Sequence, residues 1–191
     1  FPHCKESDLY SIGKVLDKTD VYREDVLRSI VTTKNMPNFG YLGYKANENK
    51  YTYARPTEDK ISQLFMNMKD LADYVIIDCV SDRSDLISSL AKAEADVIVQ
   101  VVTPTLKCMS YYAANGDQFI AFADKVVKVI NIKDNDIYLP VGEVKEHFKD
   151  VEIKIPYSHS LKQQSITGTL SEHITDKVFC DSILRLAKVV S

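Results

Sequence analysis

The chain lacks the paired cysteines that mark a disulfide scaffold or a cysteine-based metal site. No Cys-x-x-Cys occurs, and the four cysteines are scattered at Cys4, Cys79, Cys108 and Cys180. Scattered cysteines of this kind predict free buried thiols in a reducing compartment. The four histidines, at positions 3, 147, 159 and 173, show no metal-ligand spacing and predict surface side chains.

Long apolar runs, secretion signals, repeats and Gly/Ser linkers are also missing. No stretch approaches the ~20 continuous apolar residues that cross a membrane, and these residues include no recognisable signal peptide. With 191 residues, 45% hydrophobic and 27% charged, the composition predicts one soluble α/β domain spanning residues 1–191 and located in the cytoplasm. A net charge of -3 gives no general attraction to nucleic acid or to an anionic membrane.

The sequence begins at Phe1 without an initiator Met, and its first residues are not typical of a domain start. We therefore expect a fragment, or a chain whose upstream part is missing.

Helical and extended patterns alternate along the chain. Helices are expected at 6–17, about 20–34, 57–72, 83–94, 106–123, 143–149 and about 175–189. Strands are expected at 38–44, 73–78, 96–102, 125–132 and 151–155, with a loop at 45–55 and no assignment for 137–141. This alternation is typical of parallel βαβ units. It predicts a doubly wound, mostly parallel α/β sheet with helices on both faces.

Two of these helices have the clearest apolar faces. The helix 20–34 is expected to bury Val26, Leu27 and Ile30. The helix 57–72 has Thr57 as its N-cap and five apolar residues on one face: Ile61, Leu64, Phe65, Met68 and Leu71.

The segment 73–78, Asp-Tyr-Val-Ile-Ile-Asp, reads as a strand buried on both faces, because its apolar residues do not alternate with polar ones. Ligands of doubly wound sheets bind beyond the carboxyl ends of the strands. Those ends carry Asp78, Thr103-Pro104 and Asn131. An apolar strand ending in Asp is what a Walker B element requires, since the carboxylate can orient a Mg²⁺-bound water beside phosphates. Many buried strands, however, end in an Asp that only caps a turn.

The order of these parts resembles the ParA/MinD family of P-loop ATPases. The resemblance rests on Asp73–Asp78, on Ala95–Pro104 with its following Ser110-Tyr111 helix, and on the strand Val126–Asn131. The segments 153–157 and 161–168, and the opening DLYSIGKVLDK region, match the family in the same order. The match covers nearly the whole chain. The loop after Asp78 is closest to the pilus-positioning CpaE/TadZ branch.

The resemblance implies a role for individual residues. Asp78 would act on the Mg²⁺-bound water. Asn131 would hydrogen-bond the adenine ring, and Pro156 and Tyr157 would line the same base pocket. The loop after Asp78 would be switch II, which senses the γ-phosphate; its residues are Cys79, Val80, Ser81, Asp82 and Arg83.

That loop departs from the family pattern. Most relatives carry a Pro and a Gly here, and the Gly supplies backbone freedom and an amide for the γ-phosphate; residues 79–83 contain neither. Asp82 would also place a second carboxylate near phosphate, which is unfavourable unless a cation intervenes. The switch is therefore expected to be altered or inactive.

The phosphate-binding loop itself is absent from this sequence. A P-loop reads G-x-x-x-x-G-K-[ST], because its backbone amides and Lys must surround the β- and γ-phosphates. The six glycines, at 13, 40, 43, 116, 142 and 168, open no such motif. ATP and Mg²⁺ are thus expected for the complete protein, but tight binding to this chain alone is not.

The family resemblance implies an ATP-dependent spatial organiser, which positions DNA, division machinery or pilus machinery. Such a protein forms a homodimer through its nucleotide face, works with a protein partner of a positioning or secretion system, and reaches a membrane or cell pole through partners. Nucleic acid binding is not supported by the charge. The last helix shows no basic-apolar extension of the kind that anchors a protein to a membrane.

Two other readings stay open. A degenerate, non-hydrolysing scaffold that kept the fold for docking or dimerisation would explain the altered loop 79–83. A phosphoacceptor receiver domain also places Asp at strand ends, but it is much shorter and needs an acidic pair near its start.

Overall fold

The computed structural model describes residues 11–33, 36–134, 138–148, 151–170 and 172–191. The chain divides into two compact units, Phe1–Glu94 (unit 1) and Ala95–Ser191 (unit 2). The prediction of a single domain over 1–191 therefore stays a prediction. The first part of the expected helix 6–17, together with Cys4 and His3, lies outside the described residues.

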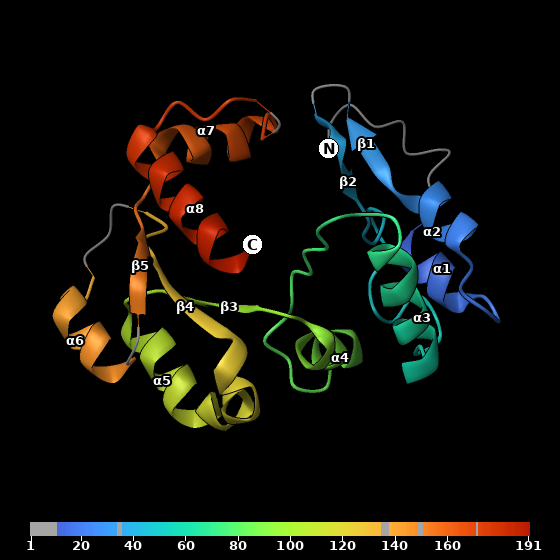
Figure 1. Cartoon of the computed structure of the whole chain (residues 1–191), viewed down its shortest axis with the longest axis horizontal. Helices are drawn as coiled ribbons and strands as arrows, with labels where there is room; N and C mark the ends of the chain where they lie inside the picture. The colour runs from blue at the N-terminus through green and yellow to red at the C-terminus, as the bar shows by residue number, and fades with distance from the viewer. Residues whose placement is uncertain (1–10, 34–35, 135–137, 149–150, 171) are drawn as a thin grey trace. The chain divides into compact units, whose positions relative to one another are not determined.

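The described residues of unit 1 form four helices and a small hairpin, which Figure 1 labels. Its elements are α1 (Ile12–Asp17), α2 (Arg23–Ser29), β1 (Val31–Thr33), β2 (Met36–Tyr41), α3 (Glu58–Lys69) and α4 (Leu86–Glu94). The strands β1 and β2 pair antiparallel, with Val31 opposite Tyr41. The expected strand 38–44 thus belongs to this hairpin and not to a parallel sheet.

Side-chain caps begin three of these helices. The Ser11 hydroxyl accepts a hydrogen bond from the Lys14 amide at 3.2 Å, and Thr57 accepts one from the Lys60 amide. The Asp85 carboxylate accepts a hydrogen bond from the Ser88 amide at 2.8 Å. Each cap satisfies an amide that the first helical turn leaves unpaired. The predicted cap at Thr57 is confirmed.

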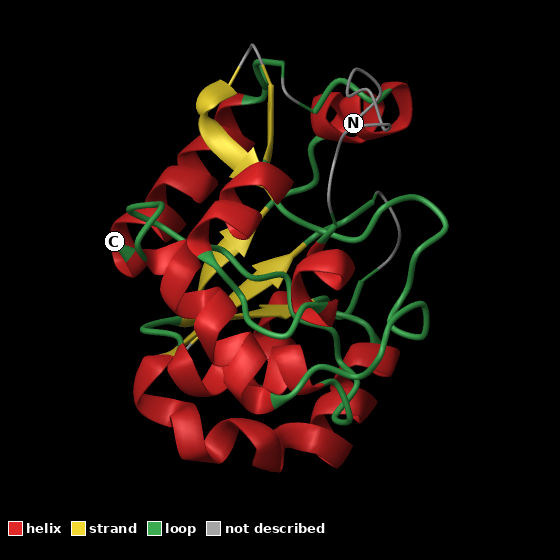
Figure 2. Ribbon diagram, turned by 90° about the vertical axis from the view of Figure 1, so that its right-hand side faces the viewer, coloured by secondary structure: helices red, strands yellow, loops and turns green. Residues whose placement is uncertain are grey.

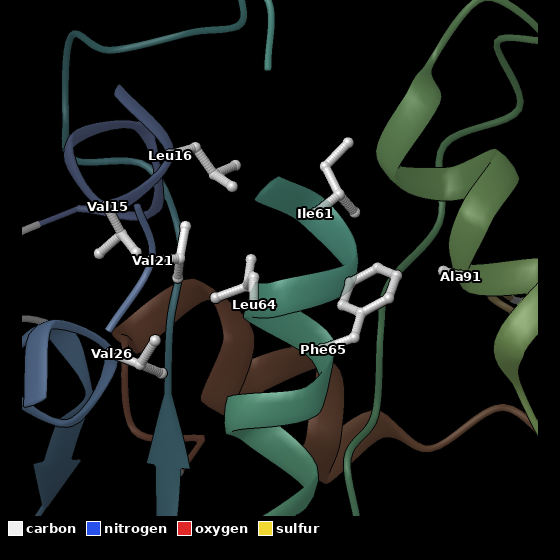
Figure 3. Close-up of a cluster of buried hydrophobic side chains, with 8 residues drawn as sticks. All are labelled: Val15, Leu16, Val21, Val26, Ile61, Leu64, Phe65 and Ala91. Carbon is white, nitrogen blue, oxygen red and sulfur yellow. The ribbon is translucent and has the colours of Figure 1, made fainter. Parts of the chain in front are cut away.

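The core of unit 1 is formed where α1, α2, α3 and α4 meet (Figure 3). Its buried side chains are Val15, Leu16, Val21, Val26, Ile61, Leu64, Phe65 and Ala91. Figure 3 shows the side chains of Val21 and Leu64 pointing toward one another. The apolar face predicted for residues 57–72 is confirmed, with Met68 and Leu71 packed at its margin.

The predicted helix 20–34 is too long. The helix ends at Ser29 and the chain continues as strand β1. Val31-Thr32-Thr33 is a run of β-branched residues, which favour a strand over a helix. Leu27 lies 53% exposed, in contrast to its expected burial, whereas Val26 is fully buried.

The predicted buried strand 73–78 is also wrong. Residues 74–80 form no ladder with any described residue, and Ile76 is 89% exposed. Tyr74 and Asp78 are exposed as well, while Ile77 packs against the core of unit 1. A strand requires a neighbour to pair its backbone groups, and the described residues supply none for this segment.

Unit 2 contains a three-stranded sheet with helices around it (Figures 1 and 2). Its elements are β3 (Ile98–Val102), α5 (Leu106–Asn115), the 3₁₀ segment η2 (Gly116–Lys125), β4 (Val126–Asn131), α6 (Val141–His147), β5 (Val151–Ile155), α7 (His159–Thr167) and α8 (Lys177–Val190). The strand order is β3-β4-β5 and both pairings are parallel. The predicted parallel α/β fold is confirmed.

Both faces of β4 are covered. Ile130 belongs to a cluster with Val144 and Phe148, which come from α6 and the residue after it. Val129 points to the opposite face, because side chains alternate along a strand, and it too has 0% exposure. The helix α8 contacts the neighbouring strand β5. Helices therefore cover the sheet on two sides, as the sequence predicted.

The predicted helix 106–123 is an α-helix only over its first half. The α-helix ends at Asn115, and residues 116–125 form a 3₁₀ segment with a kink at Phe122. Gly116 stands at the transition, and glycine weakens a continuous helix. The helix α7 was not predicted. It is capped by Gly168, whose φ of 74° is a left-handed conformation that favours glycine.

Candidate functional site

The carboxyl ends of β3, β4 and β5 lie along one edge of the sheet of unit 2. In the parallel register, Val102 pairs with Ile130, and Asn131 pairs with Ile155. The segments that leave this edge are also joined to one another. The Ile132 amide donates to the Ile155 carbonyl at 2.9 Å, and the Leu139 amide donates to the Pro104 carbonyl at 3.0 Å. This edge is where parallel α/β sheets hold ligands.

Three residues predicted to contact a base come together at this edge. Asn131 is the last residue of β4, and Pro156 and Tyr157 directly follow β5. All three are half-buried. The Tyr157 ring lies 6.5 Å from the His159 ring in an edge-on arrangement. An amide side chain, a proline ring and an aromatic ring therefore occupy neighbouring strand ends.

The predicted switch loop, residues 79–83, lies in unit 1, where it is tied to neighbouring segments. The Val80 amide donates to the Ser88 hydroxyl at 3.0 Å, and Ser88 is buried in α4. The Arg55 guanidinium donates to the Ser84 carbonyl at 3.1 Å. These contacts join the loop both to α4 and to the loop 45–55.

Asp82 is held by a cation. Its carboxylate lies 2.9 Å from the Lys50 ammonium group and accepts hydrogen bonds from the Ser84 amide at 2.9 Å and the Ser84 hydroxyl at 2.8 Å. The hydrogen bond from Lys50 is the largest cause that holds the pKa of Asp82 well below its usual range, and the two bonds from Ser84 act in the same direction. The same pairing raises the pKa of Lys50.

We expect Lys50→Met to loosen the loop 82–85 without unfolding unit 1. The substitution removes the charge and keeps an apolar stem, so amide exchange of residues 82–85 should accelerate several-fold at neutral pH. Exposed ion pairs contribute little to global stability, so the unfolding midpoint should barely move. Hydrogen exchange followed by mass spectrometry measures the exchange rates and urea denaturation measures the midpoint, with Lys14→Met as a control on an exposed lysine outside this loop.

The pH dependence of that loop has a definite sign. The pKa of Asp82 is depressed in the folded state, so its contribution is present above the ordinary carboxyl pKa and is lost as the pH falls through the lowered value. Exchange in the wild-type loop should therefore approach that of Lys50→Met in strong acid. Equal exchange of the two proteins at neutral pH would show that Lys50 does not hold the loop.

Asp78 and Cys79 are exposed at the start of this loop. The prediction that all four cysteines are buried is wrong for Cys79, whereas Cys108 and Cys180 are free and half-buried. Loss of solvent around the sulfur is the main cause that raises the pKa of the Cys79 thiol. A raised pKa disfavours the thiolate, so this cysteine is not activated as a nucleophile.

The sequence did not single out Lys50, Arg55 or Ser84. The sequence indicated only that Asp82 beside a phosphate would be unfavourable without an intervening cation. Lys50 is 32 residues away along the chain and belongs to a polar loop without a motif. Only the fold brings the two residues together. Asp78 lies in unit 1, and the residues Asn131, Pro156 and Tyr157 lie in unit 2.

Across the ranges that the structure describes, every helix is too short or too polar to cross a membrane. Within those ranges, no three or more His, Cys, Asp or Glu side chains gather as a metal-binding group.

Comparison with known proteins finds similarity among solved structures. No protein-family model and no curated protein matches the chain. Among solved structures, it is similar to the crystal structure of a ParA family ATPase from Chlorobium tepidum TLS, with a TM-score of 0.73 and 16% sequence identity. The similarity covers 93% of this chain and 75% of that one. The chain therefore has the α/β fold of a ParA family ATPase.

Proposed function

We propose that this chain is part of a ParA/MinD-like ATPase that acts as an ATP-dependent spatial organiser in the cytoplasm. The observation that carries the proposal is the placement of Asn131, Pro156 and Tyr157 at adjacent carboxyl ends of parallel strands. The fold match with a ParA family ATPase supports the same class of protein. The CpaE/TadZ branch remains a prediction from the loop after Asp78.

The residues at this edge fit the base of a nucleotide. An adenine ring is flat and presents a hydrogen-bonding edge, which the amide of Asn131 matches. Half-buried Pro156 and Tyr157 offer flat surfaces against which a ring can pack. In this proposal Asn131 orients the base, and the two residues after β5 exclude water from it.

This chain offers fewer groups that could bind the phosphates of ATP. The sequence contains no G-x-x-x-x-G-K-[ST] motif, so no described loop provides the ring of amides and the Lys that a triphosphate requires. When bound in a complete site, Mg²⁺ would neutralise phosphate charge, and Asp78 would hold one of its water molecules. We assign no hydrolytic step to this chain alone.

In the complete protein, ATP would drive homodimerisation through the nucleotide face. The dimer would engage a partner of a positioning or secretion system, which would bring it to a membrane or a cell pole. The switch loop of residues Cys79, Val80, Ser81 and Asp82 would report the nucleotide state to the partner copy.

A non-hydrolysing scaffold is the second candidate. It is favoured by the pairing of Asp82 with Lys50 and Ser84, because a loop that is held in place and lacks Gly responds poorly to a γ-phosphate. The sequence upstream of Phe1 would distinguish the ATPase from the scaffold. A K-G-G-x-G-K-[ST]-like stretch would support the ATPase, and its absence would support the scaffold.

Isothermal titration of this chain with Mg·ATP tests the phosphate part of the proposal. We expect no saturable heat in the micromolar range, because the phosphate cradle is missing from the sequence. Micromolar affinity would contradict this and would mean that another loop binds the phosphates. Titration of Mg·ATP into buffer alone controls for heats of dilution.

A further inference from the structure

A shallow groove of about 560 Å³ lies between α5 and α6 in unit 2, and we call it the α5–α6 groove. On its α5 side the lining residues are Leu106, Met109, Ser110 and Ala113. They are spaced at i, i+3, i+4 and i+7, so they form one continuous stripe along about two turns of the helix. Leu106 is 72% exposed, a high fraction for a leucine. The apolar start of this stripe is therefore open to solvent.

The bottom of the groove is apolar and held in place by the core of unit 2. Met109 and Leu139 line the groove and are half-buried. Both pack against the buried cluster that contains Ile130 and Val144. The Leu139 amide also donates a hydrogen bond to the Pro104 carbonyl at 3.0 Å. An apolar side chain that enters the groove therefore meets a preformed surface.

The α6 side of the groove is acidic. Glu143 and Glu146 both line it, are exposed, and lie one turn apart on the same side of α6, next to exposed His147. Within the described ranges, neither carboxylate takes part in an ion pair. None of the lining residues is Lys or Arg. The groove therefore favours an occupant that combines apolar side chains with positive charge.

The walls of the groove favour an occupant that is itself a helix. Both walls are helices, whose backbone amides and carbonyls are bonded internally, so they offer an extended peptide no strand edge with which to pair. A helix satisfies its own backbone groups and needs only side-chain contacts. The small side chains of Ser110 and Ala113 leave room for such a helix to approach α5 closely, because the distance between packed helices depends on the side chains at the contact.

We propose that the α5–α6 groove binds a basic, amphipathic helix of a partner protein. The partner helix lays its apolar stripe on Leu106, Met109 and Leu139. Lys or Arg side chains on one flank of that stripe then lie beside Glu143 and Glu146, where opposite charges attract. No nucleotide takes part in this contact, so it stands or falls separately from the proposed ATP site.

Two designed peptides serve as probes of the groove. Each has about 15 residues, long enough to form a helix, and carries Leu on one face; one has Lys on both flanks of that face and the other has Glu. Fluorescence anisotropy of the labelled peptides, titrated with the nucleotide-free chain, should show saturable binding of the Lys peptide and none of the Glu peptide. Leu106→Ser should weaken binding of the Lys peptide at least several-fold, because it removes the exposed start of the apolar stripe.

Exchange of the groove's charge gives the sharpest test. Glu143→Lys with Glu146→Lys should weaken binding of the Lys peptide roughly tenfold or more and should create binding of the Glu peptide. The matched control is Glu172→Lys with Asp181→Lys, which makes the same change in net charge at two exposed residues of unit 2 that do not line the groove. This control should keep the wild-type preference for the Lys peptide. Circular dichroism checks that each variant is folded.

Three results would overturn the proposal: the Lys peptide does not bind, the control variant loses as much binding as the groove variant, or Leu106→Ser binds as tightly as the wild type. Sedimentation velocity of the chain alone covers the other occupant. Self-association that Glu143→Lys with Glu146→Lys abolishes would assign the groove to a second copy of this chain and would also contradict the proposal.

Discussion

Leu64→Ala should lower the free energy of unfolding of unit 1 by about 2–5 kcal/mol. Leu64 has 0% exposure at the centre of the cluster shown in Figure 3. Truncation removes apolar contacts and leaves a cavity that rigid helical neighbours fill only in part. Urea denaturation, with amide exchange assigned to residues 11–94, measures the effect.

Met66→Ala is the matched control on the same helix. Met66 is 64% exposed, so its truncation should change the stability by no more than about 0.5 kcal/mol. If both substitutions gave the same small change, the cluster around α3 would not be the core of unit 1.

Val129→Asp should disrupt the sheet of unit 2. Val129 lies at the centre of β4 with 0% exposure, and an ionised carboxylate there would have neither water nor a partner. Burying an unpaired charge is among the few single changes that destabilise by more than about 4–5 kcal/mol. We expect loss of dispersed amide signals from residues 98–155 in an NMR spectrum.

Val101→Asp provides the comparison. Val101 pairs with Val129 in the parallel register and therefore points to the same face, but it lies on β3 and is 50% exposed. A carboxylate can be solvated there, so the cost should be about 1 kcal/mol, the range of strand propensities. A folded Val129→Asp protein with near wild-type stability would contradict the observed register and burial.

The predictions of helices and strands were most accurate where the deciding residues lie within the element itself. The helix α3 was foreseen because a cap, Thr57, and an apolar stripe at helical spacing occur within 15 residues or so. The strand β5 was placed at its observed bounds, 151–155, because Pro156 limits it. In both cases the residues that decide the structure lie within the element itself.

Prediction failed where pairing or contact with another segment decides the outcome. The apolar run 74–77 has the composition of a buried strand, but strand formation depends on a neighbour that the run does not encode. Residues 31–33 were assigned to a helix because their pairing with β2 is equally invisible in a local pattern. The ion pair between Lys50 and Asp82 joins two loops, and no spacing rule connects them.

For the candidate site, the sequence indicated which residues to consider but not how they lie relative to one another. Asn131 and Tyr157 were chosen through a family resemblance, and the observed parallel register of β4 and β5 puts them at the same edge. Their contact with a nucleotide remains a prediction. For Asp78, the expected strand that would have presented its carboxylate is not formed in unit 1.

The most direct test of the proposed site is an NMR titration of the ¹⁵N-labelled chain with adenosine, which carries the base but needs no phosphate cradle. We expect weak, saturable shifts at the amides around Asn131 and Tyr157, and their loss in Asn131→Ala. Shifts confined to other parts of the chain, or unchanged binding by Asn131→Ala, would show that the carboxyl ends of β4 and β5 do not form the base pocket.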